Sequence, residues 1–160
     1  MSRAIGHRLP DRLFALLDGR ALHERLGKAF LVTTTDPEGR PHPAMLSYGE
    51  LLAVDPSRLR LAMYEKSRTV GHLKANGLFT LSLVEPGLAY YIKGKATPLP
   101  PMVKYPRLVR FEIMIEEILE DQAEEDEAGA RITGGITFEP GPDQSDLLRS
   151  WEEMIAALRA

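Results

Sequence analysis

Three consecutive residues, Ser67, Arg68 and Thr69, have side chains that suit the binding of an anion. They follow an apolar segment that starts at Leu59 and precede a short stretch of helical character that ends at Gly77, so we expect them where a strand runs into a helix. A helix N-terminus exposes unpaired N–H groups and the positive end of the helix dipole. Ser67 suits the N-cap, while Arg68 and Thr69 add further donors. These residues predict a phosphate site, although a simple helix cap with a surface ion pair stays open as the alternative.

Other recognisable chemistry is missing from the sequence. There are no cysteines, which excludes disulfides, thiolate metal sites and a cysteine nucleophile. The four histidines share no metal-ligand spacing, and no glycine-rich nucleotide loop or serine-hydrolase elbow is found. His42 is the histidine that could approach a cofactor edge or bind a haem iron. The sequence therefore leaves the catalytic residues unknown and predicts no metal site.

Composition points to one ordinary globular domain over residues 1–160. Hydrophobic residues make up 44% and charged residues 27% of the chain, which argues against disorder. The net charge of −3 gives no general electrostatic basis for binding nucleic acid. No apolar run is long enough for a signal peptide or a membrane span, so we expect no membrane partner and a cytoplasmic protein.

The elements that must position the anion site are mostly strands. Helices are expected over residues 10–26 and 144–159, with a barrel over residues 28–138 between them. Asp36-Pro37-Glu38-Gly39 predicts the turn of a hairpin. The charge run from Glu120 to Glu127 is interpreted as a solvated hairpin tip, with an acidic metal site as the poorer alternative. The expected strands cover residues 29–35, 40–52, 59–64, 78–84, 88–96, 108–119 and 131–138, the last with Ile132, Ile136 and Phe138 inward. Such a succession indicates a mainly β fold, an antiparallel barrel-like sheet with flanking helices.

The block from Ala29 to Thr97 resembles the FMN-binding split-barrel family, the pyridoxamine 5′-phosphate oxidase-like proteins. The pieces that carry the resemblance occur in the family's order: the Asp-Pro-Glu-Gly turn, Arg40-Pro41-His42-Pro43, Ser47-Tyr48, Ser67-Arg68-Thr69, and Tyr91-Ile92-Lys93-Gly94-Lys95-Ala96. The resemblance implies an antiparallel split β-barrel of the FMN-binding type. It also implies a homodimer with the flavin at the subunit interface.

The resemblance further assigns residues to the cofactor. Ser67, Arg68 and Thr69 are placed at the FMN phosphate. The strand Met45-Leu46-Ser47 and the backbone of Ala62-Met63-Tyr64 are placed along the ring, and Lys93 is placed toward the neighbouring subunit's cofactor. A flavin carries electron and hydride chemistry on its own ring, so such an enzyme needs no recognisable catalytic motif. The expected function is that of an FMN-dependent oxidoreductase acting on a small organic substrate, with electrons from NAD(P)H.

Two departures from the family pattern keep alternatives open. Met45 and Leu46 are apolar where tight FMN binders often have polar residues. The chain ends Ala157-Leu158-Arg159-Ala160 without the Arg-x-Leu substrate motif, so we do not expect a true pyridoxamine phosphate oxidase. The alternatives are an F420-dependent reductase on the same fold and a non-enzymatic module that binds flavin or haem.

Overall fold

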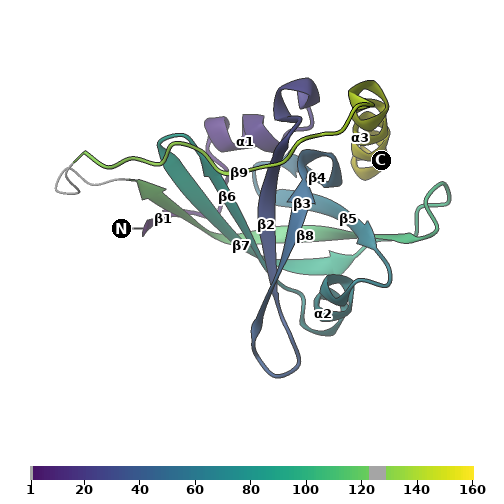
Figure 1. Ribbon diagram of the computed structural model, residues 1–160. Helices are drawn as coiled ribbons and strands as arrows, with labels where there is room; N and C mark the ends of the chain where they lie inside the picture. The colour runs from purple at the N-terminus through teal and green to yellow at the C-terminus, as the bar shows by residue number, and fades with distance from the viewer. Residues whose placement is uncertain (1, 123–128) are drawn as a thin grey trace.

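The computed structural model describes residues 2–122 and 129–160, and its centre is one strongly curled antiparallel sheet (Figure 1). Hydrogen-bonded neighbours follow the order β3-β2-β6-β7-β8-β5-β4, with β1 paired to β8 and β9 paired to β2. The mainly antiparallel β architecture expected from the sequence is thus confirmed. The strands are β1 (Ser2–Gly6), β2 (Lys28–Thr35), β3 (Pro41–Ser47), β4 (Leu51–Asp55), β5 (Arg58–Tyr64), β6 (Leu78–Glu85), β7 (Leu88–Pro98), β8 (Leu108–Gln122) and β9 (Ile136–Thr137).

Three α-helices and two 3₁₀ turns accompany the sheet: α1 (Asp11–Leu17), α2 (Arg68–Asn76), α3 (Gln144–Arg159), η1 (Leu22–Arg25) and η2 (Tyr48–Glu50). In Figure 1 helices α1 and α3 lie in the upper part of the molecule, while α2 lies below β5 and β8. The predicted C-terminal helix is confirmed with its bounds, and its apolar stripe buries Trp151, Ile155 and Leu158. No helix within residues 2–122 and 129–160 has both the length and the apolarity needed to cross a bilayer.

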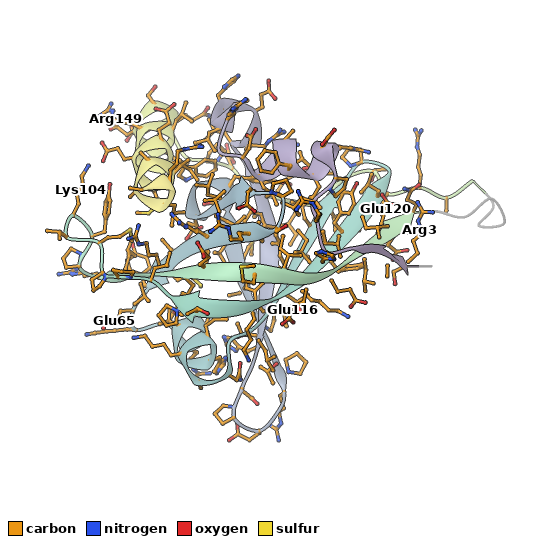
Figure 2. The ribbon with its side chains drawn as sticks, turned by 180° about the vertical axis from the view of Figure 1, so that it is seen from behind. Arg3, Glu65, Lys104, Glu116, Glu120 and Arg149 are labelled. Atoms are coloured by element: carbon orange, nitrogen blue, oxygen red, sulfur yellow. The ribbon has the colours of Figure 1, made fainter. Side chains whose placement is uncertain are left out.

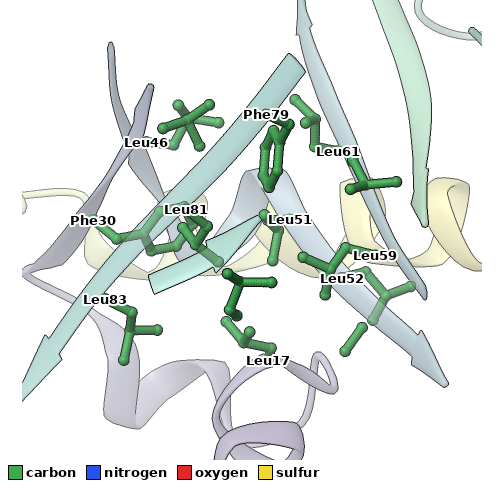
Figure 3. Packing of buried hydrophobic residues seen from close by; sticks show 14 of the residues in the cluster. Leu17, Phe30, Leu46, Leu51, Leu52, Leu59, Leu61, Phe79, Leu81 and Leu83 are labelled. Atoms are coloured by element: carbon green, nitrogen blue, oxygen red, sulfur yellow. The ribbon is translucent and has the colours of Figure 1, made fainter. Parts of the chain in front are cut away.

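The hydrophobic core lies inside the curl of the sheet (Figure 3). Alternation along the strands sends every second side chain inward. On β8, for example, Phe111 and Ile113 are fully buried while Met114 is 49% exposed. Helix α1 contributes Leu13 and Leu17 to the same cluster. The core residues labelled in Figure 3 are Leu17, Phe30, Leu46, Leu51, Leu52, Leu59, Leu61, Phe79, Leu81 and Leu83.

The predicted hairpin is confirmed, and its turn chemistry explains it. One carboxylate oxygen of Asp36 accepts hydrogen bonds from the backbone N–H groups of Glu38 (3.0 Å) and Arg40 (2.8 Å). Gly39 adopts a φ of +82°, in the left-handed region that a side chain disfavours. The turn joins β2 to β3 in a register that pairs Ala29 with Ser47 at the far end.

Two predicted elements are shorter than the sequence suggested. The helix expected over residues 10–26 ends at Leu17, because Gly19 (φ +76°) and Ala21 (φ +48°) take left-handed conformations that a right-handed helix cannot include. The strand expected over residues 40–52 is broken by η2. There the Glu50 carboxylate accepts hydrogen bonds from the N–H and hydroxyl of Ser47, which fixes a sharp bend before β4.

The last predicted strand is wrong over most of its length. Of residues 131–138 only Ile136 and Thr137 pair with a neighbour, and Ile136 and Phe138 are 37% and 36% exposed instead of inward. Gly134 and Gly135 precede β9 and bring no side chains to bury, which weakens a strand. Strand β1, in contrast, was not predicted from the sequence. It pairs with the end of β8.

The charge run expected as a hairpin tip falls mostly outside the described residues. Its first members, Glu120 and Asp121, belong to β8, and residues 123–128 are not described. On the described side, Arg3 of β1 donates to Glu120 over 2.9 Å, and the two side chains meet beside the end of β8 (Figure 2).

Candidate functional site

Helix α2 begins as the sequence predicts. Ser67 is its N-cap, with the hydroxyl oxygen accepting a hydrogen bond from the Val70 N–H over 3.2 Å. The Ser67 N–H in turn donates to the Tyr64 carbonyl (2.9 Å), so the chain passes from β5 into the helix through one tight turn. Helix geometry leaves the N–H groups of Arg68 and Thr69 without an acceptor inside the helix. An anion at this point would meet those N–H groups and the positive end of the helix dipole.

The side chains at the start of α2 differ in their exposure to solvent. Arg68 is exposed to solvent, whereas Thr69 is only 2% exposed, so of these two side chains only that of Arg68 is presented at the surface. A hollow of about 440 Å³ lies beside the helix start, lined by Tyr64, Glu65, Lys66 and Arg107. Arg107 is tied to this place because its carbonyl accepts a hydrogen bond from the Glu65 N–H (2.9 Å). Sequence reasoning missed Arg107, since it is far along the chain and carries no motif.

A second hollow of about 450 Å³ adjoins the first through Tyr64, which lines both. It contains four of the predicted ring-binding residues, Ser47, Ala62, Met63 and Tyr64. Ser47 ends β3 and the other three end β5, so the curl of the sheet brings two distant segments together. The two hollows meet at Tyr64, and we call them together the β5 groove. Its second hollow is also lined by Gly49, Glu50, Tyr105, Leu108, Leu147, Ser150, Trp151 and Met154.

The polar atoms of Ser47 are already engaged within the chain. Its N–H (2.7 Å) and its hydroxyl (2.8 Å) both donate to the same oxygen of Glu50, which holds the carboxylate against the groove. Both donors of Ser47 are therefore already used, and neither is free for the edge of a cofactor. The sequence did not predict a role for Glu50, although Ser47-x-x-Glu50 has the spacing of a capping box.

Six of the ten predicted site residues are not among the lining of either hollow: Ser67, Arg68 and Thr69 at the start of α2, and Met45, Leu46 and Lys93 farther away. Leu46 is 2% exposed and belongs to the core, while Met45, on the opposite face of β3, is 61% exposed. Lys93 lies on β7 and pairs with Glu117 of β8 over 2.7 Å. These positions leave Met45 and Lys93 as surface residues of this chain, outside both hollows of the groove.

Helix α3 forms one wall of the groove. Gly49 has no side chain, and a Cβ there would overlap the Trp151 indole, so the glycine lets α3 approach η2 closely. The opposite wall carries Tyr105, whose hydroxyl donates to Glu153 of α3 (3.3 Å). Lys104 binds the same carboxylate oxygen over 2.8 Å, and Figure 2 shows its loop beside α3. This hydrogen bond and the charge of Lys104 hold the pKa of Glu153 below its ordinary value.

Two polar clusters lie outside the groove, and the sequence alone did not indicate either of them. The rings of His42 and His72 meet edge to face, with centroids 5.0 Å apart, and His72 Nδ1 lies 3.0 Å from the Thr34 hydroxyl. Within the described part of the chain no group of three or more potential ligands suited to a metal ion is found. The buried Tyr48 donates to Glu85 (3.2 Å), and burial, followed by the Glu85 charge, raises the pKa of Tyr48. Such a phenol stays neutral and serves packing.

Comparisons with known proteins agree on the family and on the fold. A family model described as "Pyridoxamine 5′-phosphate oxidase" matches residues 25–149. The uncharacterized protein YclD of Bacillus subtilis (strain 168) is 32% identical over 153 residues, which cover 94% of this chain and 96% of YclD.

Solved structures of similar fold include HupZ of Group A Streptococcus and an F420 reductase. HupZ aligns with a TM-score of 0.56 at 16% identity, covering 79% of this chain and 99% of HupZ. The F420 reductase aligns with a TM-score of 0.51 at 16% identity, covering 69% of this chain and 98% of that one. Identities this low bear on the fold alone, and they support the split barrel.

Proposed function

The chain belongs to the pyridoxamine 5′-phosphate oxidase family, and from this premise we propose that it binds FMN in the β5 groove and acts as an oxidoreductase on a small organic substrate. When bound, FMN supplies hydride and electron transfer on its ring. The residues of this chain bind that group, orient it and exclude water from one side of it. NAD(P)H is the expected electron donor.

The observation that carries the proposal is that two hollows of different lining meet at Tyr64. FMN is a flat aromatic ring joined by a short chain to a phosphate, and the groove offers matching parts in that order. One hollow has apolar and aromatic lining from Ala62, Met63 and Tyr64 for the ring, and the other lies beside the start of α2 with Lys66 and Arg68 nearby for the phosphate. Ligand sites are commonly clefts of about 300–1,000 Å³, so the size of the groove is suitable.

We expect the groove to lie at the interface of a homodimer. Support comes from large apolar side chains left exposed on the strands of the sheet: Tyr64 (69%) lines the groove, while Met45 (61%) and Met114 (49%) lie outside it. Exposed apolar residues of this kind are common where a partner covers a surface. Sedimentation in the presence of FMN tests this part: a flavin-loaded dimer is expected, and a strict monomer that still binds flavin would contradict the interface placement.

An F420-dependent reductase is the second candidate, and the position of Arg107 favours it. F420 has a longer anionic tail than FMN, and Arg107 together with Lys66 extends the basic region past the start of α2. Glu65 lies among these cations and opposes that tail. A haem-binding or cofactor-free module is the remaining outcome.

The absorbance spectrum of the purified protein separates these functions, followed by a titration with FMN. We expect flavin bands, or saturable binding when FMN is added to the flavin-free protein. A Soret band would replace the proposal with haem binding, and saturation by F420 but not FMN would replace it with the second candidate. A featureless spectrum with no response to either would overturn it.

A further inference from the structure

The end of the β5 groove that faces α3 differs from the other end in the side chains that line it. It is walled by three aromatic residues, Tyr64, Tyr105 and Trp151, and its one lining carboxylate is that of Glu50. We propose that this end binds a small organic cation, an ammonium or quaternary ammonium group, held between the aromatic rings and Glu50. Naming this cation as the substrate rests on the proposed function. The binding of the cation does not, because it can be measured on flavin-free protein.

The Glu50 carboxylate is fixed in place before any ligand arrives. One of its oxygens accepts both the N–H and the hydroxyl of Ser47, at 2.7 and 2.8 Å. Among residues 2–122 and 129–160, no cation forms an ion pair with this carboxylate. A preorganised, unneutralised carboxylate in a groove with low-dielectric walls attracts positive charge.

The surroundings of Glu50 reinforce this preference. No lysine, arginine or histidine is found among the described residues that line this hollow. Lys104, the neighbour in sequence of the lining residue Tyr105, is paired with Glu153 over 2.8 Å. An anionic or phosphorylated substrate would therefore meet an uncompensated carboxylate here, whereas a cation would meet its counter-charge.

The aromatic walls supply the second half of the recognition. The faces of tryptophan and tyrosine rings attract cations within about 6 Å of the ring centre, and more strongly where water is excluded. Tyr105 already interacts with one cation in this way, since Lys104 Nζ lies 5.4 Å from its ring centroid. Trp151 is 6% exposed and held by α3, so its indole is a rigid wall rather than a mobile surface group.

Choline and its uncharged isostere 3,3-dimethylbutan-1-ol test the proposal, because the two differ only in the positive charge. Trp151 is the single tryptophan of the chain, so a change in its fluorescence reports binding at this wall. We expect choline to bind flavin-free protein saturably and about tenfold more tightly than the alcohol. Equal affinities, or no saturable response to choline, would overturn the proposal.

Glu50→Gln separates the charge of Glu50 from its structural role. Glutamine also serves at the third position of a capping box, so the bend at η2 should persist. We expect this variant to bind choline about tenfold more weakly, while Glu152→Gln, on the exposed side of α3, stays within about twofold of wild type. Undiminished choline binding by Glu50→Gln would also overturn the proposal.

Titration of the same samples with FMN keeps the two proposals apart. Choline binding without FMN binding would remove the proposed function and leave the cation site, then a binding site rather than a substrate site. FMN binding without choline binding would remove the cation site alone.

Discussion

The two ends of the β5 groove differ in charge and in how the chain builds them. The α2 end combines a helix N-terminus with the cations Lys66 and Arg68, nearly all from one stretch of sequence. The α3 end is aromatic and carries Glu50, and it assembles side chains from η2, β5, the loop before β8, and α3. Figure 1 shows the tip of β5 between α3 on one side and α2 on the other. One strand tip thus joins a site suited to an anion with a site suited to a cation.

This contrast explains why the α2 end could be predicted from local residue types, whereas the residues predicted at the α3 end came from the family resemblance alone. A helix cap and its neighbouring cations are local features, and Ser67 caps α2 as its residue type indicates. The α3 end depends on Gly49 admitting Trp151, a contact between positions far apart in the chain. Such contacts leave no spacing pattern to read.

The largest effect should come from removing the wall of the α3 end. Trp151→Ala deletes a buried indole that packs on Gly49, and we expect a loss of about 3–5 kcal/mol in the free energy of unfolding, measured by denaturant titration. Glu152→Ala, one residue away and exposed, should change it by less than about 0.5 kcal/mol. Equal effects of the two would mean that α3 does not pack as described.

Arg68→Ala tests the α2 end of the groove and leaves Trp151, at the α3 end, unchanged. Loss of a charge-assisted hydrogen bond to the phosphate should weaken FMN binding by about 1.5–3 kcal/mol, measured by titration. Lys74→Ala, near the other end of α2, is the matched control and should bind FMN like wild type. If Arg68→Ala also matches wild type, the phosphate lies elsewhere.

Two substitutions at Ser67 separate the stability of α2 from its anion site. Ser67→Ala removes the cap and should cost about 0.5–2 kcal/mol in the free energy of unfolding. Ser67→Asp keeps a good cap but places a negative charge at the proposed phosphate, so stability should be retained while FMN affinity falls. Unchanged FMN affinity in Ser67→Asp would break the assignment of this end to an anion.

The smallest expected effect is the acid response of the α3 end. The hydrogen bond and charge of Lys104 lower the pKa of Glu153, so their stabilising contact is present above the ordinary carboxyl pKa and is lost as pH falls through the lowered value. NMR titration of the Glu153 carboxyl should show this lowered pKa, and Lys104→Gln should return it toward its ordinary value. An identical titration in both proteins would mean that the loop carrying Tyr105 is not tied to α3 through this pair.

Sequence patterns predicted the fold well where one face of an element is buried and poorly where backbone conformation decides. The stripe on α3 and the alternation on β8 are read from apolar spacing, and both are confirmed. The helix expected over residues 10–26 forms but ends at Leu17, because Gly19 and Ala21 are left-handed, and the residue type of Ala21 does not indicate this. The bend at η2 depends on the hydrogen bond from the Ser47 N–H to the Glu50 carboxylate. The apolar pattern of residues 40–52 predicts one long strand and gives no sign of this bond.

The residues of the candidate site were also predicted correctly in part and wrongly in part. Ser47, Ala62, Met63 and Tyr64 do line one groove, as the resemblance implied. Leu46 was assigned to the cofactor but is buried, because alternation along β3 turns it into the core while Met45 faces out. Arg107 and Trp151 were missed, since each joins the groove only through the pairing of β5 with β8 or the packing of α3.

Comparing FMN with riboflavin, on wild type and on Arg68→Ala, tests the central claim most directly. The two flavins share the ring and differ by the phosphate, so the ratio of their affinities isolates the α2 end of the groove. The account predicts that wild type prefers FMN and that Arg68→Ala loses most of this preference while its affinity for riboflavin is unchanged. Equal affinity of wild type for both flavins, or binding of neither, would contradict it.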